Sequence, residues 1–195
     1  QALHRNTTAS NNTAVGRNAM EANTTGAENV AVGYLSLNAN TTAADNTAVG
    51  AQSLQVNTVG ASNSAFGRYT LQNNTASNNT AVGRSALQEN TTGTQNIAVG
   101  ATAGDALTEG NYNVAVGYTA LGTDTKGSKS VALGNYALAF QNFTSATDTY
   151  NTAVGHLAGY QVTTGQYNTL LGSLAGDSLT DSDQNVAIGY NALTA

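Results

Sequence analysis

Side chains that could carry out catalysis are scarce in this sequence of 195 residues. It contains no cysteine, which excludes a thiol nucleophile and a cysteine metal site. Of its two histidines, His4 and His156, the second stands where other copies of a repeat carry Arg or Tyr, so we expect a solvated residue. Asp181-Ser182-Asp183 predicts a turn, because the glycine-rich nonapeptide of calcium-binding rolls is missing. Two carboxylates from different repeats could still meet as a catalytic pair, but the sequence singles out no such pair. We therefore expect no catalytic residue, no metal and no cofactor.

Aromatic side chains are the better candidates, and the chemistry they offer is binding. Phe140 and Phe143, two of the three phenylalanines, fall in a stretch that interrupts the repeat. Aromatic rings in a polar loop are a common platform for sugar rings, although the same rings could instead pack under the loop or between chains. Tyr112, Tyr150 and Tyr167 each directly precede an Asn-x-x-x-Gly string, so we expect them to line one edge. There they would contact glycans or pack copies of the chain together.

The elements that position these residues come from an internal repeat of 17 residues. Asn-Thr-Ala-Val-Gly or a close variant occurs eleven times, and the glycines that end the strings are 17 residues apart, except for one spacing of 16 and one of 21. The four extra residues fall near 139–150. The repeat glycines, which define position 0 of each copy, are Gly16, Gly33, Gly50, Gly67, Gly83, Gly100, Gly117, Gly134, Gly155, Gly172 and Gly189. Such regularity is typical of a stacked array and argues against a disordered chain.

Composition excludes two classes of partner. Charged residues make up 9% of the chain, and the net charge is −5 with six Lys and Arg, whereas nucleic acid requires a dense basic face. No apolar run approaches the 18 or more residues of a membrane span, so we expect no membrane insertion. Proline is absent, which fits strands whose backbone donors are all used.

Each copy of the repeat predicts one coil of a parallel β-solenoid, with two short strands and two turns. Seventeen residues are too few for a helical hairpin repeat. Glycine at position 0, and in six copies also at +10, indicates corners that need a positive φ. Coils stack about 4.8 Å apart, so eleven of them would form a rod of about 50 Å. We therefore predict an all-β fold of eleven 17-residue coils, a single array over residues 1–195 that is a fragment of a longer fibre with partial repeats at both ends.

Apolar positions of the repeat predict which side chains face the core. Position −1 is always a large apolar residue, and +4 is Leu or Met in eight copies. The other three copies carry Gly at +4 and a large apolar residue at +7, which predicts that the core anchor has moved along the coil. These pairs are Gly104 with Leu107, Gly159 with Val162, and Gly176 with Leu179. Position −2 is Ala in ten copies, and we expect it on the outer strand face, where a small side chain lets another copy of the chain approach.

Position −4 is Asn in ten copies, and the sequence allows two roles for it. The amides could stack into a ladder along the coils. Each Asn could instead cap its own turn. Both roles are structural.

Two motifs carry a resemblance to known surface fibres. Asn-Thr-Ala-Val-Gly-x-x-Ala-Leu followed by Asn-Thr-Thr-Gly resembles the repeats of phage and virus-like tail-fibre proteins over nearly the whole chain. The string Asn185-Val186-Ala187-Ile188-Gly189 is similar, more distantly, to the Ser-Val-Ala-Ile-Gly repeats in the heads of trimeric autotransporter adhesins. The resemblance implies a left-handed β-roll wound as a homotrimer, on a virion tail fibre or on an extracellular cell surface. Its implied role is to support or carry attachment to a host surface glycan or receptor.

Three other interpretations stay open at this point. The chain could belong to a bacterial adhesin head unrelated to phage, or to a shaft that binds no ligand. It could also be an ice-binding β-solenoid, because pairs such as Thr24-Thr25 recur. Ice-binding faces, however, need Thr-x-Thr within one strand, and adjacent strand residues point to opposite faces.

Overall fold

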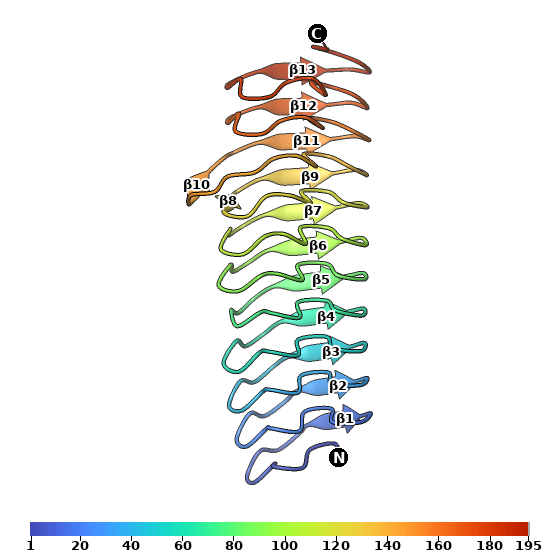
Figure 1. Ribbon diagram of the computed structural model, residues 1–195, viewed down its shortest axis with the longest axis vertical. Coiled ribbons are helices and arrows are strands. Elements are labelled where there is room, and N and C mark those ends of the chain that lie inside the picture. The colour runs from blue at the N-terminus through green and yellow to red at the C-terminus, as the bar shows by residue number, and fades with distance from the viewer. Residues whose placement is uncertain (195) are drawn as a thin grey trace.

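The computed structural model describes residues 1–194 and shows an all-β parallel β-solenoid of about ten turns (Figure 1). The last residue of the predicted array, Ala195, lies outside the described residues. Eleven three-residue strands form one parallel sheet, each paired with the strands of the neighbouring coils. In chain order they are β1 (Thr13–Val15), β2 (Val30–Val32), β3 (Thr47–Val49), β4 (Ser64–Phe66), β5 (Thr80–Val82), β6 (Ile97–Val99), β7 (Val114–Val116), β9 (Val131–Leu133), β11 (Thr152–Val154), β12 (Thr169–Leu171) and β13 (Val186–Ile188).

Strand register confirms the 17-residue coil. Thr13 pairs with Val30 and Val30 pairs with Thr47, so equal positions of successive repeats lie above one another. Two further strands, β8 (Gly127–Ser128) and β10 (Thr147–Asp148), pair in parallel as a separate two-stranded sheet. In Figure 1 this small sheet projects from the left side of the stack, at the coil that holds the insertion.

The return half of each coil is a series of turns, so the prediction of two strands per coil is wrong outside β8 and β10. The backbone explains this difference. Positions +2 and +4 both adopt positive φ, for example 55° at Leu35 and 50° at Leu37. Two left-handed residues so close together bend the chain repeatedly and prevent an extended strand.

Strand side chains face the opposite way from our prediction. The Ala at position −2 points inward, and Ala48 and Ala98 are 0% exposed. Positions −3 and −1 point outward, so Val99 remains 38% exposed. A methyl group fits inside because the interior is already occupied by the buried Leu or Met of position +4, such as Leu54, which belongs to the same core cluster. The large apolar side chains of −1 are therefore left on the outer surface.

The shifted core anchors are confirmed. Leu107 and Val162 are fully buried at position +7, as Leu87 is at +4 in the consensus coil. A Cβ on Gly104 would lie 3.2 Å from Leu107 Cδ1, so the side chain from +7 fills the space that +4 leaves empty. Leu179 is partly buried and packs against the same core.

Asparagines at −4 fulfil both of the predicted roles. The backbone N–H of Asn46 donates to Asn29 Oδ1 at 2.9 Å, which links successive coils. The Asn46 Nδ2 group donates to the carbonyl of Ala44 at 3.1 Å, within its own turn, and to the carbonyl of Gly60 at 2.9 Å in the next coil. The Asn46 Oδ1 atom in turn accepts from the backbone N–H of Asn63 at 3.0 Å, so this one side chain satisfies a buried donor and a buried acceptor.

The corner geometry predicted for position 0 is confirmed, because all eleven repeat glycines have φ between 119° and 141°. The same prediction for +10 is wrong: none of those six glycines has a positive φ. Most of these positions require glycine because the next coil approaches closely. A Cβ on Gly93, for example, would lie 2.3 Å from the carbonyl oxygen of Gly110 in the next coil.

Candidate ligand-binding site

A buried polar network anchors the insertion at its base. Gln141 takes the place of the Asn found at +7 in the five coils that start at Gly16 to Gly83, and it is 0% exposed. Its Nε2 group donates to Asp124 Oδ2 at 2.6 Å and to Ser130 Oγ at 2.8 Å, and its Oε1 accepts from Asn151 Nδ2 at 2.8 Å. Because these groups are satisfied internally, the extra residues are displaced outward as a fixed bulge instead of opening the core.

The two phenylalanines of the insertion have different environments. Phe143 is 6% exposed, and its backbone N–H donates to Asp124 Oδ1 at 3.0 Å. It packs under the loop, which was the alternative to a ligand contact. Phe140 is 46% exposed and offers its ring to solvent. Of the two residues, Phe140 is therefore the one positioned to contact a ligand.

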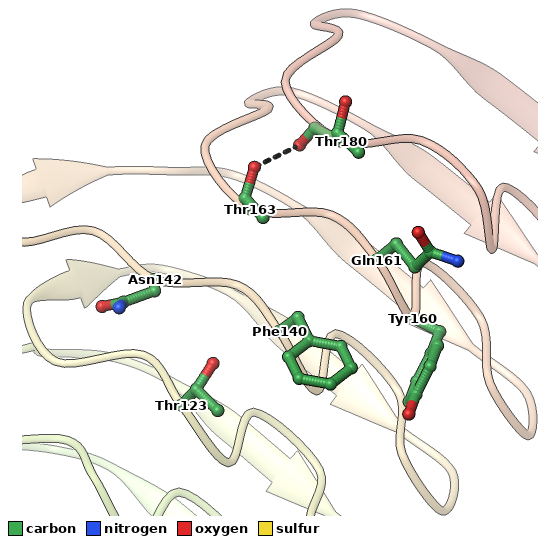
Figure 2. Close-up of a pocket in the computed structure, with 7 residues that line it drawn as sticks. All are labelled: Thr123, Phe140, Asn142, Tyr160, Gln161, Thr163 and Thr180. Carbon is green, nitrogen blue, oxygen red and sulfur yellow. Dashed lines mark hydrogen bonds between the residues drawn. The ribbon is translucent and has the colours of Figure 1, made fainter.

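Phe140 contributes to a hollow in the surface beside the insertion. Its ring meets the Tyr160 ring edge-on, with centroids 4.9 Å apart and planes inclined by 72°. The hollow has a volume of about 760 Å³. Figure 2 shows the two rings side by side, with hydroxyl and amide side chains around them. The lining residues are Thr123, Phe140, Asn142, Tyr160, Gln161, Thr163 and Thr180.

Small side chains make room for this hollow. Tyr160 occupies position +5 of its coil. Three consecutive earlier coils carry glutamine at this position, and their side-chain amides form a ladder. Gln72 Nε2 donates to Gln55 Oε1 at 2.9 Å, and Gln88 Nε2 donates to Gln72 Oε1 at 3.2 Å. In the two coils directly before Tyr160 the same position holds Gly122 and Ala139. The ladder therefore stops, and the two coils before Tyr160 place no long side chain beside its ring in that column, whereas the coil after it places Asp177 there.

Further tyrosines extend the aromatic surface away from the hollow. Tyr136 meets Tyr160 edge-on at 6.2 Å and Tyr118 edge-on at 5.3 Å. Loss of hydration, and then the neighbouring Tyr118, raise the pKa of Tyr136. Its hydroxyl therefore stays protonated and remains a hydrogen-bond donor at neutral pH.

Tyr150 and Tyr167 lie in one column at another edge of the stack, as predicted. Their rings stack at 5.6 Å with an interplanar angle of 13°. Lys129 occupies the same position between Tyr112 and Tyr150, with its Nζ 5.0 Å from the Tyr150 ring centroid. Lys129 Nζ also donates to Asp148 at 2.6 Å, and that hydrogen bond raises the pKa of Lys129. Tyr112 is exposed at this edge but takes part in neither ring contact.

These two aromatic groups differ in shape and charge. The edge that carries Tyr150 and Tyr167 also carries the Lys129–Asp148 salt bridge. The hollow of Phe140 and Tyr160 is concave and has no charged residue in its lining. Sequence reasoning missed Tyr160 and the polar lining, although Gly122 and Ala139 at position +5 carried a detectable signal.

Other kinds of site find no support in the part of the chain that the structure describes. Within residues 1–194 no group of three or more His, Asp or Glu side chains could hold a metal ion. His4 and His156 are exposed. No helix in the described residues is long and apolar enough to cross a bilayer.

Comparisons with protein-family models, curated proteins and solved structures give no significant match for this chain.

Proposed function

We propose that this chain is a shaft segment of a homotrimeric fibre on a virion or cell surface, with a left-handed β-roll in each copy, and that it supports or carries attachment to a host receptor. The role is structural and non-catalytic. The observation that carries the proposal is the outer face of the eleven-stranded sheet. The trimeric state, the handedness and the location come from the resemblance to tail-fibre and adhesin repeats.

The outer sheet face presents a continuous apolar column. Position −1 of every strand, from Val15 to Ile188, is a large apolar residue that is partly or fully exposed. Position −3 adds Val or Ile in five strands. A contiguous apolar strip of this length is unusual on a monomeric protein and marks an interaction surface.

A second copy of the same chain fits this strip better than an unrelated protein does. The strip repeats at every coil, and only a partner with the same spacing can match all eleven strands in register. Positions −3 and −1 of the eleven strands carry no charged residue, so copies can meet along the strip without placing like charges together. Copies packed side by side along their long axes form a closed, symmetric rod in which each copy buries the same strip.

Light scattering on the purified chain tests the proposal. We expect a mass of about three times 19.7 kDa. Substituting Val82→Lys together with Val99→Lys places two charges on the strip and should shift the mass to that of one chain, while circular dichroism stays β-like. The matched control is Val59→Lys, because Val59 is exposed in a turn outside the sheet. A wild-type chain that is folded and monomeric would contradict the proposal.

Ice binding has less support than the fibre. The Thr24-Thr25 pair lies in a bend. Position −3 of the strands is Thr in some coils and Val or Ile in others. The regular threonine array that such a surface requires is therefore not continuous along the sheet.

A further inference from the structure

We propose that the hollow at Phe140 and Tyr160 binds a neutral saccharide, with the apolar face of a sugar ring against one aromatic ring and the other, inclined ring at its side. The inference rests on the proposed attachment role and gives that role a class of ligand. It concerns a surface that is separate from the outer sheet face, because every lining residue lies outside the strands.

The two rings form a fixed platform. Phe140 and Tyr160 belong to successive coils, and the backbone N–H of Phe140 donates to the carbonyl of Tyr160 at 3.2 Å. Their edge-to-face contact at 4.9 Å holds one ring against the other. Little conformational entropy is lost when a ligand docks on side chains that are already ordered.

Polar groups surround the platform at positions suited to hydroxyl ligands. Among residues 1–194, no hydrogen bond engages the side-chain amide of Gln161 or the Nδ2 group of Asn142. The Thr123 hydroxyl donates to the carbonyl of Ala139 at 2.9 Å, which leaves its lone pairs free to accept. Amides and hydroxyls offer both donors and acceptors, as the alternating hydroxyls of a sugar require.

The lining favours a neutral ligand over a charged one. None of the seven lining residues is charged. A carboxylate or phosphate would find no cationic partner among these residues. Saccharides that carry sialic acid or phosphate are therefore expected to bind more weakly than neutral ones.

The same geometry disfavours an extended peptide. The backbone N–H of Asn142 donates to the carbonyl of Thr163 at 2.9 Å, and the Thr163 hydroxyl donates to the carbonyl of Thr180 at 3.0 Å (Figure 2). These groups already form hydrogen bonds between neighbouring coils, so they cannot form main-chain hydrogen bonds with a peptide bound as an added strand.

A glycan array followed by calorimetric titration of the best neutral saccharide tests the inference. We expect the wild-type chain to bind at least one neutral saccharide. Phe140→Ala and Tyr160→Ala should each weaken that binding by about tenfold or more, since each removes half of the platform. Phe140→Trp keeps an aromatic face and should retain binding. Tyr112→Ala is the matched control, because Tyr112 is an exposed aromatic outside the hollow.

Three results would overturn the inference: no neutral saccharide bound by the wild type, binding limited to charged glycans, or binding that Phe140→Ala and Tyr160→Ala leave unchanged. Circular dichroism and light scattering on the same samples confirm that each variant is folded and keeps its mass. A wild-type monomer that binds the saccharide would contradict the fibre and leave the hollow supported. A trimer that binds none would contradict the hollow alone.

Discussion

Glycine at position 0 of the repeat is required for two separable reasons. Gly100 and Gly189 both have φ values that L-residues rarely adopt, 137° and 119°. At Gly100 a Cβ would also lie 2.4 Å from the carbonyl oxygen of Gly117 in the next coil. At Gly189 a Cβ would meet nothing within 4 Å. The first site therefore combines backbone strain with a steric clash, whereas the second has the strain alone.

Alanine substitution at these two glycines should give different losses of stability. We expect Gly100→Ala to lower the free energy of unfolding by about 3 kcal/mol or more, because the neighbouring coil must move. Gly189→Ala should lower it by about 1 kcal/mol, from backbone strain. Chemical denaturation followed by circular dichroism measures both values. Equal losses would show that the close approach of the coils contributes nothing.

Single residues also show how far the sequence predicts the binding surface. Phe140 and Phe143 are equal candidates in the sequence, because both fall in the insertion, and only the burial of Phe143 in the folded chain distinguishes them. Tyr160 could not be recognised from its own neighbours in the chain. Its exposure depends on Gly122 and Ala139, which lie beside it through the stack and become visible only when the repeats are aligned.

At the scale of the coil, the moved anchor creates a conflict with the coil below it. Asn90 at position +7 would normally accept a hydrogen bond from the Asn of the next coil, as Asn23 accepts from Asn40 Nδ2 at 2.8 Å. The next coil instead carries Leu107, and Asn90 Oδ1 is buried without a partner in the described residues. Asn40 Oδ1 is also buried without a partner in the described residues, although its next coil carries Asn57, so Leu107 removes a possible donor for Asn90 but an Asn at this position does not always supply one.

A double-mutant cycle tests whether the anchor pair acts as a unit. Leu107→Asn alone should destabilise the protein by about 2–4 kcal/mol, because a cavity replaces the leucine. Gly104→Leu alone should cost about 1–3 kcal/mol through crowding against Leu107. The double variant restores the consensus coil and a donor for Asn90 Oδ1, so we expect it within about 1 kcal/mol of the wild type. Additive losses would contradict this interpretation.

Elements were predicted unevenly from the sequence. The 17-residue period fixes the number of coils and the register, since equal residues must stack. It does not determine which way a strand faces. The run at Thr47–Val49 alternates small and large residues, and the sequence pattern alone favours the large one inside. The narrow interior decides otherwise, because the leucine column has already filled it.

At the scale of the whole molecule, the stack should tolerate the loss of one complete coil. Deleting residues 51–67 joins Gly50 to Arg68 and leaves every column in phase. We expect the protein to stay folded, with a melting temperature lowered by less than about 5 °C, because each coil contacts only its neighbours. Deleting residues 51–58 puts the remaining columns out of phase and should abolish the cooperative transition. Thermal denaturation followed by circular dichroism distinguishes the two deletions, and equal tolerance of both would contradict the stacked register.

The hydrogen bonds between coils run along the axis of the rod, and this direction has a mechanical consequence. Tension applied to the two ends acts on every junction in series, so each junction carries the same load. The breaking force is then set by the weakest junction and not by the number of coils. The junction at the insertion has side-chain links between its coils as well as backbone hydrogen bonds, from Gln141 to Asp124 and from Lys129 to Asp148. The coils that carry the aromatic hollow are thereby held against a pull along the rod.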